Sequence, residues 1–555
     1  MMKKRQYKDV IITLALLWAL AWPCQGWGQG VAKDIEPVWA EEVFVHLSDP
    51  VALTGDQLWL AITVKSQGQA SSSVIVYVDL LDRDGTPVKQ TQAGLTMGQA
   101  EAYLEVPTHL PSDNYLLRVY TRNSPYLNPD SGIHHQIVTV INPQSPPSIV
   151  DPQPFPEWEM QTDNHFIQTN KKSYGLREKV FLTLQLDPHS SYHLAVRQLS
   201  HLPVIPANQW KKGEIYDPIE NNPKLIPELY GHIVQGKSLA SKVDTTETFF
   251  LSAHGRQSNL FLTHPLPNGD LFFETGAFRH FDYFIVQSSR SENQVDFVLE
   301  SPFLPLRPKE GFELPPLQLS EAHREYIHSR MLAQEARNYF YPDHFLPVAD
   351  QPSQFNADKI YLLDDYNRFE DLETTIREYV QEAFVRRRNR KTSFYTANLS
   401  YSNLFKNEPL VLVDAMPVFD TDALARLDPK GIKSLEVVAR YYFFQKEIFE
   451  GIISLTSFKG DFGEFDLPKN ALFIEYPGIQ QPKKINYPPS SPEANNHSPD
   501  FRNLLYWEAH ATTDVTGRKQ ISFSTSDVTG FFEIHLSHFD ENGALVEATK
   551  IIEVK

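Results

Sequence analysis

Residues 408–462 read EPLVLVDAMPVFDTDALARLDPKGIKSLEVVARYYFFQKEIFEGIISLTSFKGDF and decide the fold of the second half of the chain. The apolar run Pro409–Val413 predicts a strand. Asp422 is placed to cap a short helix, which the following Pro and Gly would end. Ile432–Val438 and Gly451–Thr456 are rich in β-branched residues and predict two more strands. The stretch therefore predicts a small α+β unit.

This pattern resembles the plug domain of TonB-dependent outer-membrane receptors, in the Bacteroidetes-type form with PLVLVDG, I-x-S-I-E-V and GVI-x-I-x-T-x-K-G segments. The matching residues are Pro409–Asp414, Ile432–Val437 and Gly451–Gly460. Ala415 stands where the family usually has Gly, so a different turn is expected there. Only 95 residues follow Gly460, too few for a barrel of strands of about 9–11 residues each. The resemblance implies a plug-like domain without a barrel over residues 341–478.

The first 30 residues carry a basic start, an apolar run at Ile11–Trp22 and then small residues. This order predicts a secretory signal peptide, because the run is too short to span a bilayer. We therefore expect export, with the protein in the periplasm or associated with the outer membrane. Whether Cys24 is lipidated stays open, since Trp22 and Pro23 fit a lipobox poorly.

The chain is acidic, with a formal net charge of −18. Loss of residues 1–30 would remove four cations and one anion and bring the charge to −21. Such a surface argues against nucleic-acid partners. The single cysteine would leave with the same segment, so neither disulfides nor thiolate chemistry is expected in the mature chain.

Residues 31–143 contain about seven short strands separated by turn residues, which predicts a β-sandwich. Gly55 lies where the turn between the first strands needs a positive φ. The segments VFVHLSDP at 43–50, TGDQLWL at 54–60 and YLLRVYTRN at 115–123 resemble the second macroglobulin-type (MG2-like) domain. Ser48-Asp49-Pro50 stands where that family usually has Asp-Lys-Pro. A macroglobulin thioester is excluded, because it needs a cysteine.

The remaining segments predict further domains. Residues 144–157 and 479–498 read as Pro-rich linkers. Residues 228–305 resemble a carboxypeptidase-regulatory type of sandwich. Residues 318–340 predict a helix, with a buried stripe formed by Ile327, Met331, Leu332, Ala336 and Tyr339.

Two incomplete β segments lie far apart in the sequence. Residues 158–227 supply three strands, and residues 499–555 supply four strands around Asp-x-x-Gly turns at 514, 527 and 540. Our hypothesis is that both belong to one split sandwich, which holds the regulatory-like and plug-like domains as insertions. The predicted fold class is multidomain and mainly β, with several immunoglobulin-like or macroglobulin-like sandwiches and a small α+β plug-like domain.

Several sequence motifs resemble known nucleotide-binding or metal-binding sites. Gly231–Ser238 matches the Walker A pattern, but its central Ile233 and Val234 suit an ordinary strand. His134 and His135 would diverge on a strand, and exposed histidines are the simpler interpretation. We find no Gly-x-Ser-x-Gly elbow, no His-Glu-x-x-His and no cysteine nucleophile. We therefore predict no enzymatic activity, no cofactor and no metal.

Two clusters are candidate partner contacts. One consists of the cations Arg386, Arg387, Arg388, Arg390 and Lys391. The alternative interpretation is that these cations form a solvated hairpin without a partner. The other consists of Tyr441, Tyr442 and Phe443, continued by Phe444. The alternative interpretation is that these side chains alternate between the core and the surface of a strand.

The combination of domains resembles Bacteroidetes exported proteins that join a macroglobulin-type domain to a barrel-less plug-like domain. It implies a non-catalytic cell-envelope binding or scaffold protein, with other envelope or outer-membrane proteins as partners. A glycan-binding protein is the alternative and predicts a row of exposed Trp or Tyr. An envelope hydrolase is the third candidate and predicts a pocket of converging titratable groups.

Overall fold

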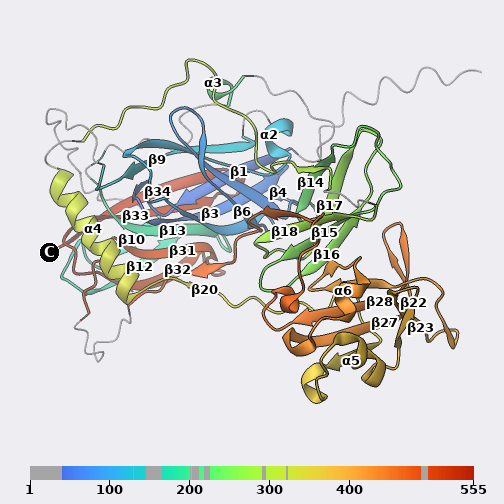
Figure 1. The fold of residues 1–555 in the computed structure, drawn as a ribbon. Coiled ribbons are helices and arrows are strands. Elements are labelled where there is room, and N and C mark those ends of the chain that lie inside the picture. Colours follow the sequence, from blue (N-terminus) through green and yellow to red (C-terminus); the bar gives the residue numbers. More distant parts are fainter. Residues whose placement is uncertain are drawn as a thin grey trace, which may run out of the picture.

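The computed structural model describes residues 40–128, 131–145, 165–200, 202, 212–217, 226–290, 295–319, 323–488 and 498–555. They form a multidomain, mainly β protein, which confirms the predicted fold class (Figure 1). The expected signal peptide and residues 146–157 of the first expected linker lie outside the described residues. Among the helices that are described, none has the length and apolar character needed to cross a membrane.

The first sandwich packs two sheets face to face. In one sheet, β3 (Gln57–Ser66) lies between β1 (Glu41–Leu47) and β7 (Gln99–Glu105), and β4 (Gln69–Ala70) extends it. The other has the order β2 (Val51–Leu53), β9 (Ile133–Ile141), β8 (Asp113–Tyr120), β5 (Ile75–Leu81) and β6 (Pro87–Gly94). Both sheets bury Val, Leu and Ile side chains in one core. Gly55 has the expected positive φ, +88°, in the turn before β3. The short helix α2 (Ser124–Leu127) follows β8, and α3 (Lys212–Ile215) packs near it.

The second sandwich is built from two distant segments. One sheet has the order β10 (Ile167–Thr169), β12 (Lys179–Gln185) and β32 (Arg518–Ser524). The other has the order β11 (Ser173–Tyr174), β34 (Leu545–Val554), β33 (Gly530–Phe539), β13 (Ser191–Gln198) and β31 (Leu504–Thr512). Segments 158–227 and 499–555 thus share both sheets, and β13 lies between two C-terminal strands. We call this domain the split sandwich.

The third sandwich follows. One sheet has the order β17 (Asp270–Glu274), β14 (Ile233–Ser238) and β19 (Phe297–Leu299). The other sheet has the order β16 (Asn259–Thr263), β15 (Phe249–His254), β18 (Tyr283–Ser288) and β29 (Leu472–Glu475). Residues 472–475 fall within the predicted bounds of the plug-like domain, 341–478. The structure instead pairs β29 with β18, because Leu472 and Ile474 alternate into the core of this sandwich.

The α+β domain contains the stretch at residues 408–462. Its main sheet has the order β21 (Lys359–Leu362), β27 (Ile432–Phe444), β28 (Glu447–Ser457), β25 (Leu410–Val413) and β26 (Met416–Pro417). Its second sheet has the order β22 (Ala383–Arg388), β23 (Lys391–Asn398) and β24 (Asn403–Leu404). Its helical elements are α5 (Leu372–Tyr379), α6 (Thr421–Ala425), η1 (Leu363–Asp365), η2 (Pro429–Gly431) and η3 (Phe462–Glu464). Asp420, not the expected Asp422, caps α6 by accepting a hydrogen bond from the amide of Ala423. Figure 1 shows this domain as a lobe beneath the third sandwich.

The helix α4 (His323–Phe340) packs on the first sandwich with a face that only partly matches the predicted stripe, of which Ile327 and Met331 pack against the sandwich. Leu332 and Tyr339 of the expected stripe are 47% and 80% exposed. The buried residues include Tyr326, Arg330 and Ala333. The prediction was wrong for Leu332 and Tyr339, because Tyr326 and the paired Arg330 take the buried positions on the helix.

The second expected linker is largely ordered against the body of the protein. Ile479 and Ile485 are buried, and Gln480 accepts a 2.9 Å hydrogen bond from the amide of Tyr103. Close by, β20 (His344–Phe345) pairs with β30 (Lys483–Lys484). Residues 479–488, which follow β29 of the third sandwich, therefore pack along the first sandwich rather than act as a free linker.

Buried polar contacts hold the domains together. Between the first and third sandwiches, Tyr77 donates a 2.8 Å hydrogen bond to the Glu228 carboxylate, and Arg122 donates a 2.8 Å bond to the Ile233 carbonyl. Between the first and split sandwiches, Trp507 donates a 2.7 Å hydrogen bond from its indole to Glu101. These contacts make the three sandwiches one continuous body.

Candidate interaction surfaces

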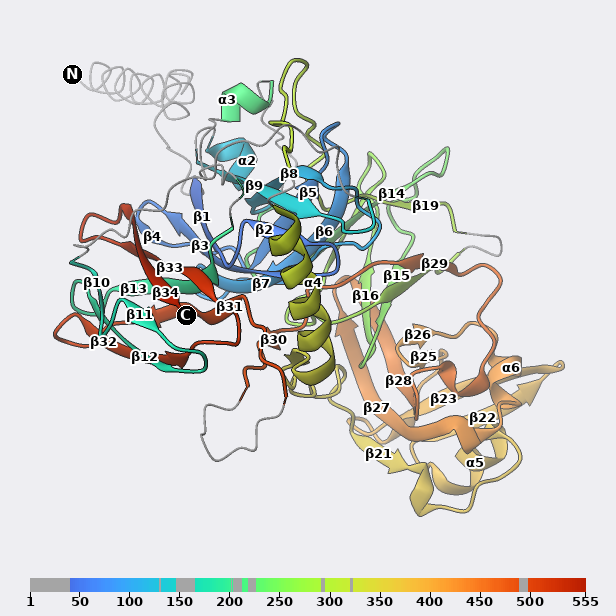
Figure 2. The same cartoon turned by 90° about the vertical axis from the view of Figure 1, so that its left-hand side faces the viewer.

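The hairpin of β27 and β28 extends beyond the rest of its sheet. Past Val438 the two strands pair only with each other, with Tyr442 opposite Phe449 and Phe443 opposite Ile448. Neighbouring side chains on a strand point to opposite faces. Tyr441, Phe443 and Ile448 therefore share one face, and Tyr442, Phe444 and Phe449 share the other. Figure 2 shows the long strands rising from the α+β domain beside the third sandwich.

The inner face of this hairpin is packed. The rings of Tyr442 and Phe444 meet Phe355 edge to face, with centroids 5.5 and 6.4 Å apart. They adjoin an apolar cluster that contains Phe250, Leu260 and Leu262 of the third sandwich. Tyr442, a predicted partner contact, is thus half-buried and turned inward, so the prediction is wrong for this residue.

The tip of the hairpin is also held. The carboxylate of Glu447 accepts a 2.6 Å hydrogen bond from the Thr248 hydroxyl and lies 2.9 Å from His264 Nε2. The Thr248 bond keeps the pKa of Glu447 below its ordinary value. The hairpin is consequently fixed to the third sandwich rather than free at its end.

The outer face is open and mainly apolar, with Glu450 opposite Tyr441 bound to the amides of Lys406 and Asn407. Phe443 is 71% exposed, Ile448 58% and Tyr441 43%. A loop lies beside it, because Phe405 meets Tyr441 edge to face at 4.8 Å. This loop adds exposed apolar side chains, and we call the whole set the apolar face: Leu399, Tyr401, Leu404, Tyr441, Phe443 and Ile448. Adjacent exposed apolar side chains of this kind mark interaction sites.

Of the six residues of this surface, only Tyr441 and Phe443 were predicted from the sequence. Ile448 was detectable, since a two-residue turn at Gln445-Lys446 places it opposite Phe443. The contributions of Leu399, Tyr401 and Leu404 depend on the path of a loop, which no periodic pattern reveals.

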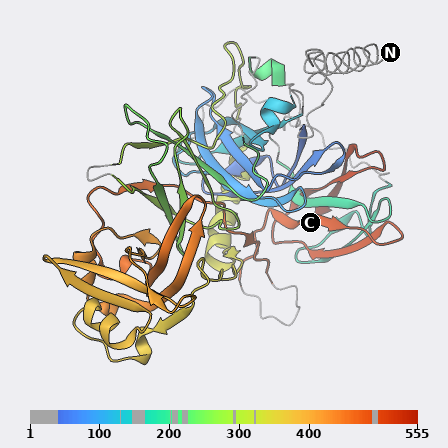
Figure 3. The ribbon, with the colours of Figure 1, turned by 90° about the vertical axis from the view of Figure 1, so that its right-hand side faces the viewer.

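The five candidate cations lie in the hairpin of β22 and β23, which we call the basic hairpin. Asn389 and Arg390 have φ values of +52° and +64°, the geometry of a two-residue turn between antiparallel strands. All five cations, Arg386, Arg387, Arg388, Arg390 and Lys391, are exposed. The guanidinium of Arg386 lies over the ring of Tyr395 at 5.3 Å. Figure 3 shows this hairpin projecting from the outer side of the α+β domain.

The apolar face and the basic hairpin are separate surfaces. Lys391 begins β23, while Leu399 directly follows its end and donates a 2.9 Å hydrogen bond to the carbonyl of Ala439. Leu399 is eight positions after Lys391, a span of about 26 Å at about 3.3 Å per residue. A single small partner contact cannot cover both.

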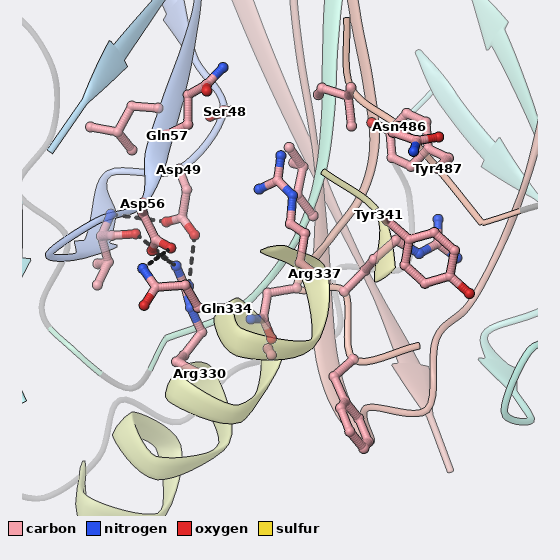
Figure 4. Close-up of a pocket in the computed structure, with 18 residues that line it drawn as sticks. Ser48, Asp49, Asp56, Gln57, Arg330, Gln334, Arg337, Tyr341, Asn486 and Tyr487 are labelled. Atoms are coloured by element: carbon pink, nitrogen blue, oxygen red, sulfur yellow. Dashed lines mark hydrogen bonds and ion pairs between the residues drawn. The ribbon is translucent and has the colours of Figure 1, made fainter. Parts of the chain in front are cut away.

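A small cavity of about 70 Å³ lies where α4, the turn before β3 and residues 485–487 and 501–504 meet (Figure 4). Arg330 donates a 2.9 Å bond to Asp49 and a 3.2 Å bond to Asp56, and Gln334 donates a 2.8 Å bond to Asp56. Arg337 and Arg502 are likewise paired with carboxylates. Because these charges neutralise one another, the cavity is best explained as a structural joint.

The motifs that suggested other chemistry have structural roles. Gly231–Ser238 leads into and forms β14, and a side chain at Gly236 would collide with the Phe297 ring. His134 and His135 lie in β9 and are buried, not exposed as expected, and burial lowers the pKa of His134 to about 4. Within the described ranges no three potential metal ligands gather at one point.

Comparisons with known proteins give only distant matches. No protein-family model and no curated protein matches the chain. Among solved structures, native alpha-2-macroglobulin of E. coli is 8% identical over 94% of this chain and 40% of that one, with a TM-score of 0.24. Salmonella alpha-2-macroglobulin reacted with methylamine is 8% identical over 93% and 40% of the two chains, with a TM-score of 0.23. Escherichia coli alpha-2-macroglobulin activated by porcine elastase is 9% identical over 93% and 44%, with a TM-score of 0.24. The chain spans about two fifths of the length of these proteins, and the mainly β architecture rests on its own sheets.

Proposed function

We propose that the protein is a non-catalytic binding or scaffold protein of the cell envelope, which associates with another envelope or outer-membrane protein through the apolar face. The observation that carries the proposal is the rigid presentation of Phe443 and Ile448. Their side chains are exposed, while the reverse side of the same hairpin is packed and its tip is anchored by Glu447.

A fixed apolar surface favours binding for two physical reasons. Side chains that are already ordered lose little conformational entropy when a partner covers them. Burial of Phe443 and Ile448 would contribute about 1.5–3 kcal/mol each, the range of interface anchors. The resemblance of the α+β domain to a receptor plug supports an envelope partner.

The glycan-binding alternative has less support. A sugar-binding row usually presents flat aromatic rings, and Trp is the most effective of them. Both tryptophans within the described part of the chain, Trp59 and Trp507, are buried. The exposed aromatic side chains of the apolar face are joined by Ile448, Leu399 and Leu404, which suit a protein surface better than a sugar.

Site-specific photo-crosslinking in cells that express the full chain tests the proposal. A photoreactive amino acid at Phe443 should give a discrete adduct of higher mass, and Ile448→Asp in the same chain should abolish it. The matched control is the same amino acid at Val515, which is also 71% exposed but lies on the split sandwich. Equal adducts from both positions, or a lone soluble monomer with none, would overturn the proposal.

A further inference from the structure

The basic hairpin has a free strand edge in addition to its charge. β22 is the first strand of the order β22-β23-β24, and no described strand pairs with its other edge. Along β23 fully buried side chains alternate with partly buried ones after the exposed Lys391, but from Arg386 onward every side chain of β22 is exposed. The outer half of β22 therefore offers unpaired main-chain groups between cations on both faces.

The cations of this hairpin form no close ion pair within the described parts of the chain, although the Asp422 carboxylate, which binds the Thr392 amide, interacts with Arg387 at longer range. No ion pair joins a carboxylate to Arg386, Arg387, Arg388, Arg390 or Lys391. Arg388 lies directly opposite Lys391 in the register, and like charges opposite each other destabilise a strand pair. A ligand that brings negative charge would relieve this repulsion.

We infer that the outer edge of β22 binds an extended acidic segment of another protein, which adds to the sheet as a strand. The inference rests on the proposal that the chain acts by binding, but it concerns a second surface. A free edge supplies main-chain hydrogen bonds to an extended peptide, and the positive charge of the hairpin within a chain of net charge −18 selects an acidic one.

The register of β22 defines the pattern that such a segment should have. Phe384, Arg386 and Arg388 point to one face, since alternate residues of a strand share a face. Acidic residues at every second position would therefore lie opposite Arg386 and Arg388. An apolar residue at the preceding position on the same face would meet Phe384, which is partly exposed.

The basic hairpin also fits simpler explanations, which lead to different results. A protective role against edge-to-edge aggregation needs no ligand. A general polyanion site needs charge alone and no main-chain pairing. Anionic lipid headgroups need neither an extended backbone nor alternating charges.

The test uses the full chain and a labelled peptide of about eight residues with alternating Glu and Thr, followed by fluorescence anisotropy. We expect binding that weakens between about 50 and about 300 mM NaCl. Arg386→Glu/Arg388→Glu should weaken it at least about tenfold. The control Arg518→Glu/Lys519→Glu makes the same change in net charge on β32 and should leave binding unchanged.

A second peptide separates strand addition from simple charge attraction. The same sequence with every second amide N-methylated keeps its charge but loses the main-chain donors of one edge. We expect it to bind at least about tenfold more weakly. Equal binding by both peptides, preference for anionic vesicles, or no binding would each overturn the inference. None of these results affects the crosslinking test at Phe443.

Discussion

His46 of the first sandwich stacks on His535 of the split sandwich, with ring centroids 4.6 Å apart. His46 Nδ1 also lies 2.8 Å from the Ser537 hydroxyl across the same interface. His193 is 3.4 Å from Thr63 and accepts a 3.1 Å hydrogen bond from the amide of His510. We call this group the histidine interface. The charged groups around it are Arg197, Glu101, Glu533 and Glu547.

The first prediction is that acid weakens this interface. Burial, followed by the neighbouring His535, His193 and Arg197, lowers the pKa of His46 well below its ordinary value, and burial lowers the pKa of His193 to about 3. Below about pH 6.5 these histidines are protonated in the unfolded chain but remain neutral in the folded chain. The free energy of unfolding therefore decreases as the pH falls below about 6.5. Each such histidine contributes a loss of about 1.4 kcal/mol per pH unit in that window. The midpoint temperature of unfolding should fall steeply from about pH 7 to about pH 5.

A variant isolates the contribution of His46. His46→Phe/Ser537→Ala removes the titrating ring together with the hydroxyl that would lose its partner, and it should flatten the dependence of stability on pH. His109→Gln, which changes an exposed histidine, should leave that dependence as it is in the wild type. An unchanged slope in the double variant would show that His46 does not cause the acid sensitivity.

The second prediction concerns the attachment of α4. Arg330 is buried and paired with Asp49 and Asp56. Arg330→Met should leave two carboxylates without their cation, at a cost of about 3–5 kcal/mol. Deuterium uptake of residues 323–340 should rise accordingly. Leu332→Ser is the control on the exposed face of the same helix and should have an effect within about 0.5 kcal/mol.

Much of the fold could be predicted because its signals are local. The alternation of Tyr441–Phe444 predicted one inward and one outward face, which the structure has. Turn residues at 514, 527 and 540 marked the boundaries between β31, β32, β33 and β34. Such features depend on residues a few positions apart, so a single sequence contains them.

The rest depends on contacts between distant residues. Arg330 is buried only because carboxylates about 280 positions earlier receive its charge, and no helical period reveals that partner. The strand β29 is too short to assign to a sheet without seeing β18 beside it. The sequence alone did not distinguish the basic cluster from the aromatic cluster as a contact surface. In the structure, the length of β23 places the two clusters near opposite ends of that strand.

The third prediction tests the turn after β25. The Asp414 carboxylate is buried and accepts hydrogen bonds from the Ser457 amide at 2.7 Å, the Ser457 hydroxyl at 2.6 Å and the Phe462 amide at 2.9 Å. The two central residues of the turn, Asp414 and Ala415, have positive φ values of 45° and 66°. Asp414→Ala should destabilise the domain by about 3 kcal/mol, because buried donors lose their acceptor. Asp466→Ala, at an exposed position, is the control. Equal unfolding midpoints for the two variants would contradict this role.

The fourth prediction separates the two faces of one strand. Phe443→Ser should change stability by no more than about 0.5 kcal/mol, since its side chain is exposed. Tyr442→Ser/Phe444→Ser should cost about 2–4 kcal/mol, because it removes two rings packed on Phe355. The double variant should also free the hairpin tip from the third sandwich, so trypsin should cut after Lys446 much faster than in the wild type. If Phe443→Ser proved as destabilising as the double variant, the hairpin would be packed on both faces, and the apolar face would belong to the core rather than to a partner.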